Sequence, residues 1–215
     1  CNHLFEDFPL GNGYVQILSE MFRNQTPSFS ISADTVRRSS SAVQLTDKST
    51  GAIHFRNCGI NGFTVASVLE NIRQHRIFLH HSPVITLLIG INDIGLIMNT
   101  DRMDSQKEQM IREFATHYNE LLDLLTADAR QVILMEPFIF PHPEEYETWI
   151  PYVHTMSDII RQLSVRFRLP FLPLHNYFNK EATQSGFDAI TTDGIHLTLY
   201  GHKLLAEKLF PLLQS

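Results

Sequence analysis

Apolar residues recur every three or four positions in several stretches of the chain, which is the spacing of one helical face. This pattern predicts helices that begin near Tyr14, Val65, Ser105 and Tyr152, and a final helix over about 199–213. Ser105 and Glu108 have the spacing of a capping box, which places the start of the third helix at Ser105. The apolar positions of these helices are Tyr14, Ile17, Leu18, Met21, Phe22, Val65, Val68, Leu69, Ile72, Ile111, Phe114, Tyr118, Leu121, Leu122, Leu125, Tyr152, Val153, Met156, Ile159, Ile160 and Leu163.

Four short stretches between the helices have the composition of β-strands: residues 52–57, 84–89, 131–135 and 169–174. The second and third are almost wholly apolar, as expected for strands buried on both faces of a parallel sheet. Strands that alternate with helices predict a parallel sheet with helices on both faces. Residues 24–50 are rich in Ser, Thr and Asp without a period, which predicts an irregular excursion or a hairpin.

Composition narrows the class of protein further. A length of 215 residues without an obvious linker predicts a single domain over 1–215. The net charge is −6 and the 17 basic residues are scattered, which argues against a nucleic-acid partner. No apolar run approaches the roughly 20 residues of a membrane span. A small-molecule substrate is the expected partner, and the sequence leaves the oligomeric state open.

The two cysteines, Cys1 and Cys58, do not make a disulfide framework and are compatible with a reducing compartment. Together with the lack of a visible signal peptide, this favours a cytoplasmic location. The first residue is Cys1 rather than Met, so the natural N-terminus is not visible. Cys58 is expected to behave as a small buried apolar residue.

An acid and an imidazole lie three residues apart just before the final helix, at Asp193 and His196. A carboxylate at this spacing can accept the Nδ1 proton of the histidine and stabilise the imidazolium that forms when Nε2 takes a proton. This pair is the base and orienting acid of a hydrolytic triad. The alternative is that Asp193 caps a helix and His196 packs beside it.

Other polar residues follow the predicted strands, where parallel sheets bind their ligands. The backbone N–H of Gly62 and the side-chain amide of Asn92 could donate to the oxyanion of an acyl-transfer intermediate. Two simpler explanations exist. Gly62 could serve only a turn that needs positive φ, and Asn92 with Asp93 could form an Asx-turn after the strand.

Three motifs resemble those of the SGNH (GDSL-type) hydrolases in order and separation. They are Asn57-Cys58-Gly59-Ile60-Asn61-Gly62, Gly90-Ile91-Asn92-Asp93 and Asp193-Gly194-Ile195-His196. The resemblance extends from about Gly11 to the C-terminus. The stretches Gly13-Tyr14-Val15, Leu134-Met135-Glu136-Pro137-Phe138 and Gly201-His202 are similar to a bacterial subgroup that includes acetylxylan esterases.

The resemblance implies a flavodoxin-like three-layer α/β/α sandwich that hydrolyses carboxylic esters without a metal or cofactor. His196 and Asp193 would be triad members, and Gly62 and Asn92 would be oxyanion donors. From the subgroup, small acetyl esters, including those of carbohydrates, are the expected substrates.

One departure from the family pattern concerns the nucleophile. The family carries it in a Gly-Asp-Ser motif after the first strand, and this chain contains neither that motif nor that strand. Counting back from Tyr14 places the nucleophile at or just before Cys1. A serine upstream of residue 1, or Cys1 itself, would fill the position. Neither Ser67, inside a predicted helix, nor Ser39–Ser41, in a polar loop, has the required setting. A non-catalytic binding module is the alternative function.

The remaining histidines and a group of aromatic residues have simpler expected roles. His80, His81 and His142 lack the partners of a metal site, and no HExxH motif is present. His202, in the first turn of the final helix, is expected to pack or to hydrogen-bond locally. Four aromatic residues gather in the Pro-rich loop after Glu136, where they form either extra core or the wall of a substrate pocket: Phe138, Phe140, Tyr146 and Trp149.

Overall fold

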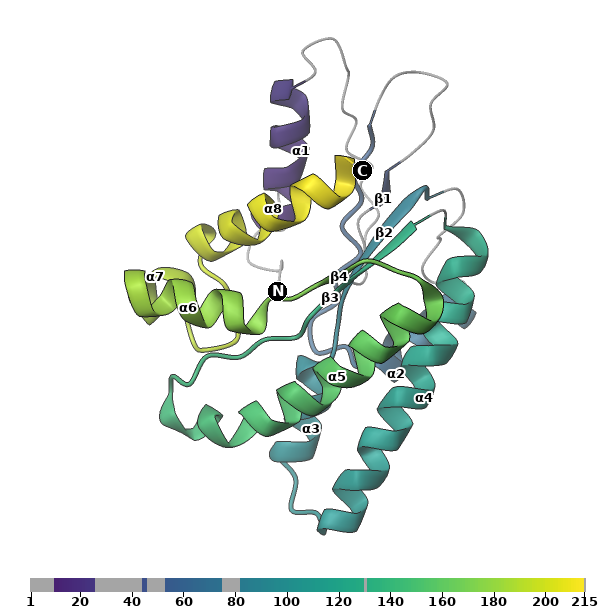
Figure 1. Cartoon of the computed structure of the whole chain (residues 1–215), viewed down its shortest axis with the longest axis vertical. Helices are drawn as coiled ribbons and strands as arrows, with labels where there is room; N and C mark the ends of the chain where they lie inside the picture. The colour runs from purple at the N-terminus through teal and green to yellow at the C-terminus, as the bar shows by residue number, and fades with distance from the viewer. Residues whose placement is uncertain (1–9, 26–43, 46–52, 75–81, 130, 215) are drawn as a thin grey trace.

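A small central sheet lies between two layers of helices in the computed structural model, which describes residues 10–25, 44–45, 53–74, 82–129 and 131–214 (Figure 1). Within these residues the strands occur in the order β1 (Gln44–Leu45), β2 (Val84–Leu88), β3 (Gln131–Met135) and β4 (Phe171–Leu172). The last three are parallel, whereas the two-residue β1 pairs antiparallel with β2. The predicted parallel sheet is therefore confirmed, with one short antiparallel strand at its edge.

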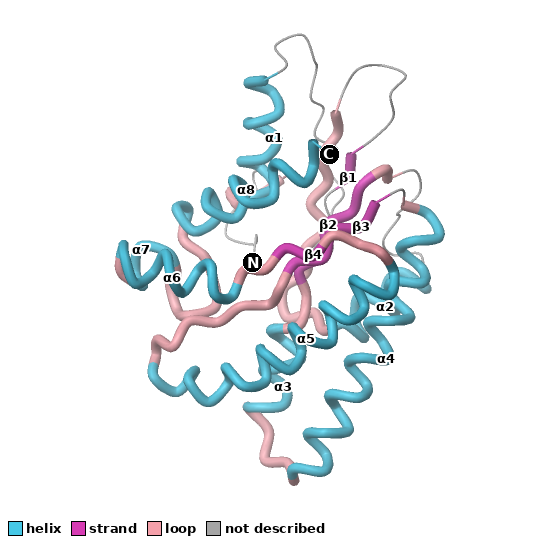
Figure 2. Tube along the Cα trace, in the orientation of Figure 1, coloured by secondary structure: helices cyan, strands magenta, loops and turns pink. Residues whose placement is uncertain are grey.

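The helices divide between the two faces of this sheet (Figures 1 and 2). One layer contains α2 (Val65–Arg73), α3 (Ile91–Met98), α4 (Asp104–Asp128) and α5 (Ile150–Phe167). The other contains α1 (Tyr14–Gln25), α6 (His175–Ser185), α7 (Phe187–Ile190) and α8 (Leu199–Gln214). A short 3-10 helix, η1 (Glu144–Trp149), leads into α5.

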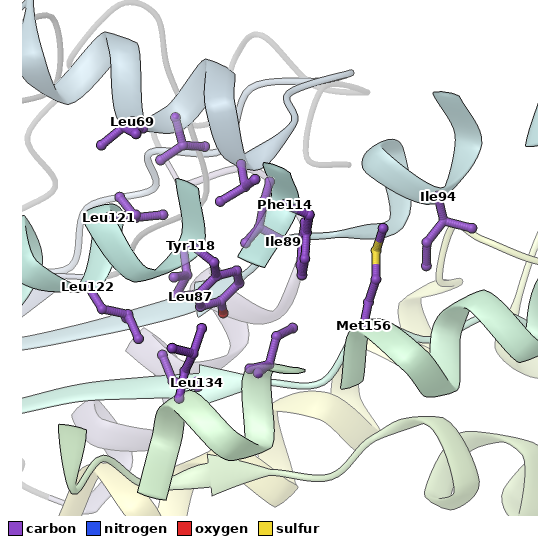
Figure 3. Packing of buried hydrophobic residues seen from close by; sticks show 14 of the residues in the cluster. Leu69, Leu87, Ile89, Ile94, Phe114, Tyr118, Leu121, Leu122, Leu134 and Met156 are labelled. Atoms are coloured by element: carbon purple, nitrogen blue, oxygen red, sulfur yellow. The ribbon is translucent and has the colours of Figure 1, made fainter. Parts of the chain in front are cut away.

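Side chains alternate between the two layers along β3. Val132 and Leu134 pack with the α2–α5 layer, and Ile133 and Met135 pack with the layer of α1 and α8. All four side chains are fully buried. Figure 3 shows the first of these clusters, in which Leu134 lies against Leu87 and the α4 side chains. The continuous apolar run of this strand thus reflects burial on both faces, as the sequence predicts, and each such side chain contributes about 1.5–3 kcal/mol.

The helices predicted from the apolar spacing are present, with different ends. The stripe that includes Phe114, Tyr118 and Leu121 is buried along α4. This helix begins at Asp104, so the predicted capping box of Ser105 and Glu108 is wrong. Instead, the N–H of Met103 donates to Oε1 of Gln106 at 3.0 Å. The side-chain acceptor is therefore Gln106, two residues before Glu108, which the sequence suggested.

The strand predicted over 52–57 is not formed in its described part, 53–57, where only Phe55 makes an isolated bridge. Phe55 is nonetheless fully buried, with its ring 5.6 Å from that of Phe22. The prediction of a strand is therefore wrong for residues 53–57, whereas the burial of Phe55 agrees with the apolar character of the stretch. The strand predicted over 169–174 is reduced to the two residues of β4. Most of the excursion predicted over 24–50 lies outside the described residues, except for the end of α1 and for β1.

The last helix, α8, agrees with its predicted range to within one residue. The helix α3 was not predicted, although it begins three residues after the last residue of β2 and carries the candidate site residue Asn92. In the part of the chain that the structure describes, no helix is long and apolar enough to cross a membrane.

Candidate active site

The carboxyl end of the parallel strands opens into a pocket that brings separate motifs together. Gly62 precedes α2, Asn92 lies in the first turn of α3, and His196 precedes α8, yet all three line this pocket. Pro137, just after β3, and Phe138 complete the same wall. The prediction that these residues meet at one pocket is therefore confirmed, and Asn92 lies just after the carboxyl end of β2, as expected for a parallel sheet.

His196 is held by the carboxylate three residues before it. Nδ1 of His196 lies 2.5 Å from Oδ2 of Asp193. The second oxygen, Oδ1, accepts the backbone N–H of His196 at 2.7 Å and that of Ile195 at 3.0 Å. Asp193 does not line the pocket, so it binds the imidazole of His196 on the side away from the pocket. A carboxylate that binds Nδ1 leaves Nε2 as the nitrogen for proton transfer.

The same contacts keep Asp193 ionised. Partial burial acts to raise its pKa, but hydrogen bonds from the backbone and the ring of His196 and from the N–H of Ile195 outweigh it, and the pKa is lowered. The pair is about half exposed, with side-chain exposures of 40% for His196 and 49% for Asp193. Its geometry therefore rests on the hydrogen bonds of the loop more than on the strength of a buried ion pair.

The loop around the pair is fixed by contacts at both of its ends. Thr191 donates its hydroxyl to the carbonyl of His196 at 2.8 Å and accepts the N–H of Gly194 at 2.9 Å. Farther away in the chain, Phe140 donates its backbone N–H to the carbonyl of Gly194 at 2.9 Å. The Pro-rich loop after β3 thus positions the loop that carries the imidazole.

Gly62 adopts positive φ, at 76°, in the turn before α2. A Cβ at this position would meet no atom within 4 Å, so the backbone conformation, and not crowding, favours glycine here. Within the described residues its N–H donates no hydrogen bond. The turn expected as the simpler explanation is real, and it leaves a backbone donor open at the pocket.

Asn92 and Asp93 do not form a turn after the strand; they belong to the first helical turn of α3. The Nδ2 group of Asn92 donates to the carbonyl of Phe63 at 2.8 Å. An amide nitrogen carries two hydrogens, so the second remains available to the pocket that Asn92 lines. The same contact ties α3 to the turn that contains Gly62.

His202 has a larger part in the site than its sequence position indicated. Its ring packs as predicted, but against a distant segment: it stacks on Tyr14 of α1 with the ring centroids 6.4 Å apart, and both residues line the pocket. Its Nδ1 is buried without a hydrogen-bond partner among the described residues. Burial is the main cause that lowers its pKa, to about 4, so the ring is neutral at pH 7. Its helical spacing from Leu205, another wall residue, was the available signal.

The aromatic residues of the Pro-rich loop have two different roles. Phe138 lines the pocket, whereas Phe140 and Trp149 are buried in the two cores. The Tyr146 ring is tilted against the ring of Trp149, with the ring centroids 4.9 Å apart, and Tyr146 does not line the pocket.

The remaining candidates lie away from the pocket or outside the described residues. Ser67 lies inside α2 and bonds to Thr64, Cys58 is buried as expected, and His142 stacks on Phe187. Cys1, Ser39–Ser41, His80 and His81 lie outside the described residues. No group of three or more His, Cys, Asp or Glu residues that could hold a metal occurs in the described ranges.

Comparison with known proteins identifies the family. The model of the GDSL-like lipase/acylhydrolase family matches residues 13–204. The chain belongs to this family. As a GDSL-like acylhydrolase it is a carboxylic ester hydrolase that acts on small-molecule esters, with the α/β fold of the SGNH hydrolases. The match includes the turn at Gly62, the Asn92 motif and the Asp193–His196 loop.

Solved structures share the fold of this GDSL-like hydrolase at low sequence identity. LAE5, an α/β hydrolase from the metagenome of Lake Arreo in Spain, has a TM-score of 0.70 and 19% identity over 94% of this chain and 81% of its own. Axe2, an acetylxylan esterase from Geobacillus stearothermophilus, has a TM-score of 0.67 and 19% identity over 96% and 83%. A GDSL-like lipase from Parabacteroides merdae has a TM-score of 0.67 and 20% identity over 93% and 80%. No curated protein matches the sequence significantly.

Proposed function

We propose that this GDSL-like hydrolase is a serine esterase that removes small acyl groups, acetyl first among them, from esters that include acetylated carbohydrates. The observation that carries the proposal is the convergence of His196, Asn92 and Gly62 on one pocket, with Asp193 bound to Nδ1 of His196. The acetyl group and the carbohydrate are suggested by the acetylxylan esterases among the similar structures. A cavity of about 130 Å³ with a largely apolar wall suits a small acyl group.

In the proposed reaction, Nε2 of His196 takes the proton of the nucleophile as it attacks the ester carbonyl. Asp193 holds the ring and stabilises the imidazolium. The N–H of Gly62 and the free Nδ2 hydrogen of Asn92 donate to the oxyanion, each worth about 3 kcal/mol of transition-state stabilisation. His196 then protonates the leaving alcohol, and the same steps with water release the acid.

The nucleophile of this reaction has to come from outside the described residues. No Ser, Thr or Cys is among the described residues that line the pocket. We propose a serine of a Gly-Asp-Ser motif that precedes residue 1 in the natural protein, with Cys1 as the alternative. Peptide mapping of a covalent adduct separates the two.

The test is fluorophosphonate labelling of the full-length protein with intact-mass analysis, beside turnover of p-nitrophenyl acetate. We expect one adduct, on the upstream serine, and turnover that His196→Ala reduces by a factor of at least about 10³. His154→Ala is the matched control, because it removes an exposed imidazole of α5 that does not line the pocket.

Three results would count against this assignment. No adduct and no turnover in the full-length protein would contradict the esterase and favour an SGNH-fold binding module. An adduct on Cys1 would replace the serine. Activity of His196→Ala within about tenfold of wild type would exclude His196 as the base.

A further inference from the structure

Two consecutive residues of α3 hold the segment that follows Gly62. Asn92 binds the carbonyl of Phe63 at 2.8 Å, and the Asp93 carboxylate accepts the N–H of Val65 through both oxygens, at 3.2 Å each. Residues 63–65 are therefore fixed to the end of β2 by an amide on one side and a carboxylate on the other. The proposed mechanism uses Asn92 but gives Asp93 no task.

Asp93 meets the start of α2 at a group that no other described side chain satisfies. Val65 is the first residue of α2, and its N–H is one of the four without a partner inside the helix. Thr64, the N-cap, accepts the N–H of Ser67 at 3.2 Å and leaves that of Val65 to Asp93. A carboxylate at a helix N-terminus is also favoured by the helix dipole.

The position of α2 determines where the open N–H of Gly62 points. Gly62 lies three residues before Val65, in a turn closed by the 3.5 Å contact from the N–H of Phe63 to the carbonyl of Ile60. That contact is long, so the turn depends on its attachment to α3. An oxyanion donor must lie within about 2.7–3.1 Å of the developing charge, and a misplacement of about 1 Å can cost about 10²-fold in rate.

We propose that Asp93 is a positioning residue of the oxyanion hole: by holding the N–H of Val65 it fixes the turn that presents the Gly62 N–H to the pocket. This rests on the proposed esterase function for its kinetic consequence, but the contact itself is independent of it. An acceptor oxygen, and not the negative charge, is what the role requires.

The experiment compares Asp93→Leu, which has a similar size and no acceptor, with Asp93→Asn, which keeps one. In the full-length enzyme, with p-nitrophenyl acetate as substrate, we expect Asp93→Leu to lower kcat by about tenfold or more and to change KM by less than about threefold. Asp93→Asn should retain kcat within about threefold of wild type. If Asp93→Leu does not fold, Asp93→Ala takes its place with the same expectation.

Gln106→Ala is the matched control, because it also removes the side-chain acceptor of a backbone N–H at the start of a helix, α4, away from the pocket. Its kcat should equal that of wild type. Three results would each overturn the proposal: Asp93→Leu with wild-type kcat, Asp93→Asn as slow as Asp93→Leu, or an equal loss in Gln106→Ala.

A second measurement does not depend on catalysis. Hydrogen–deuterium exchange of the peptide that contains residues 59–66 should be faster in Asp93→Leu than in wild type and unchanged in Asp93→Asn. Unchanged exchange in Asp93→Leu would contradict the positioning role even if the protein proved not to be an esterase. Faster exchange without any wild-type turnover would leave the positioning role standing and reject the esterase.

Discussion

Gly194, between Asp193 and His196, shows how one residue without a side chain can determine the place of a catalytic loop. A Cβ at this position would lie 2.2 Å from the carbonyl oxygen of His142 and 2.7 Å from the ring of Tyr146. Its φ is also positive, at 90°. The loop therefore approaches the Pro-rich segment as closely as a backbone can, and Phe140 bonds to it at that point.

We predict that Gly194→Ala lowers both stability and activity, because the collision with His142 has to displace the Asp193–His196 loop. The expected destabilisation is at least about 3 kcal/mol, the upper end of the cost of a strained φ alone, and kcat should fall by at least about tenfold. Urea unfolding and turnover of p-nitrophenyl acetate measure the two effects.

Gly186 provides the control for this substitution. Its φ is positive as well, at 88°, but a Cβ there would meet nothing within 4 Å. Gly186→Ala should show only the backbone cost, about 1–3 kcal/mol, and wild-type kcat. Equal losses in the two variants would mean that the close approach at Gly194 has no effect of its own.

At the scale of the elements, Glu136 connects the end of β3 to the start of α6. Its carboxylate is buried and accepts the N–H of Leu174 at 2.7 Å and of His175 at 2.8 Å. Arg161 of α5 is 3.9 Å from the other carboxylate oxygen. One side chain thus satisfies the two backbone donors with which α6 begins, at the edge of the sheet that carries the pocket.

Loss of this acceptor should be costly. We predict that Glu136→Leu destabilises the protein by about 2–5 kcal/mol, because two buried N–H groups would lose their partner, whereas Glu136→Gln keeps an acceptor and costs less. Glu120→Ala, which breaks the exposed ion pair with Arg73, should cost less than about 1 kcal/mol. The urea concentration at the midpoint of unfolding would measure the stability of all three variants, provided that the dependence of the unfolding free energy on urea concentration is the same in each. A Glu136→Leu variant as stable as Glu120→Ala would contradict this account.

At the scale of the whole molecule, two groups of the site make stability depend on pH in opposite directions. Burial raises the pKa of Asp93 to about 7, against the hydrogen bond from Val65. The folded protein therefore binds this proton more tightly than the unfolded chain, and the contribution to stability falls as pH rises from about 4 to about 7. Burial lowers the pKa of His202 to about 4, so its contribution rises with pH between about 4 and 6.5.

The difference between wild type and Asp93→Asn isolates the first of these effects, since His202 contributes equally to both. We predict that Asp93→Asn becomes more stable relative to wild type as pH rises from 4.5 to 7.5. The change in the free energy of unfolding should be at most about 1.4 kcal/mol for each unit by which the pKa of Asp93 is raised. Tyr118, whose pKa is raised by burial and then by the charge of Asp93, stays neutral throughout this range. Urea unfolding at four pH values would test the trend, and a constant difference would contradict it.

The sequence determined by itself what depends on local pattern. Apolar runs indicated that residues 84–88 and 131–135 are strands covered on both faces, and helical spacing found α4, α5 and α8 within a few residues. The three-residue spacing of Asp193 and His196 allowed their pairing to be predicted, with a capped helix as the alternative, because the two residues lie in one loop. Burial and short-range pairing depend on residues that are close together in the chain, so the sequence alone can predict them.

Only the tertiary structure decided what depends on pairing between distant segments. Residues 53–57 were predicted as a strand, but the structure forms none there, although Phe55 is fully buried. The attachment of Val65 to Asp93, the close approach of Gly194 to His142, and the place of His202 in the pocket wall join residues from 28 to 188 positions apart. Such contacts arise when the sheet brings its strand ends to one edge, and it is this convergence that turns separate polar residues into a site.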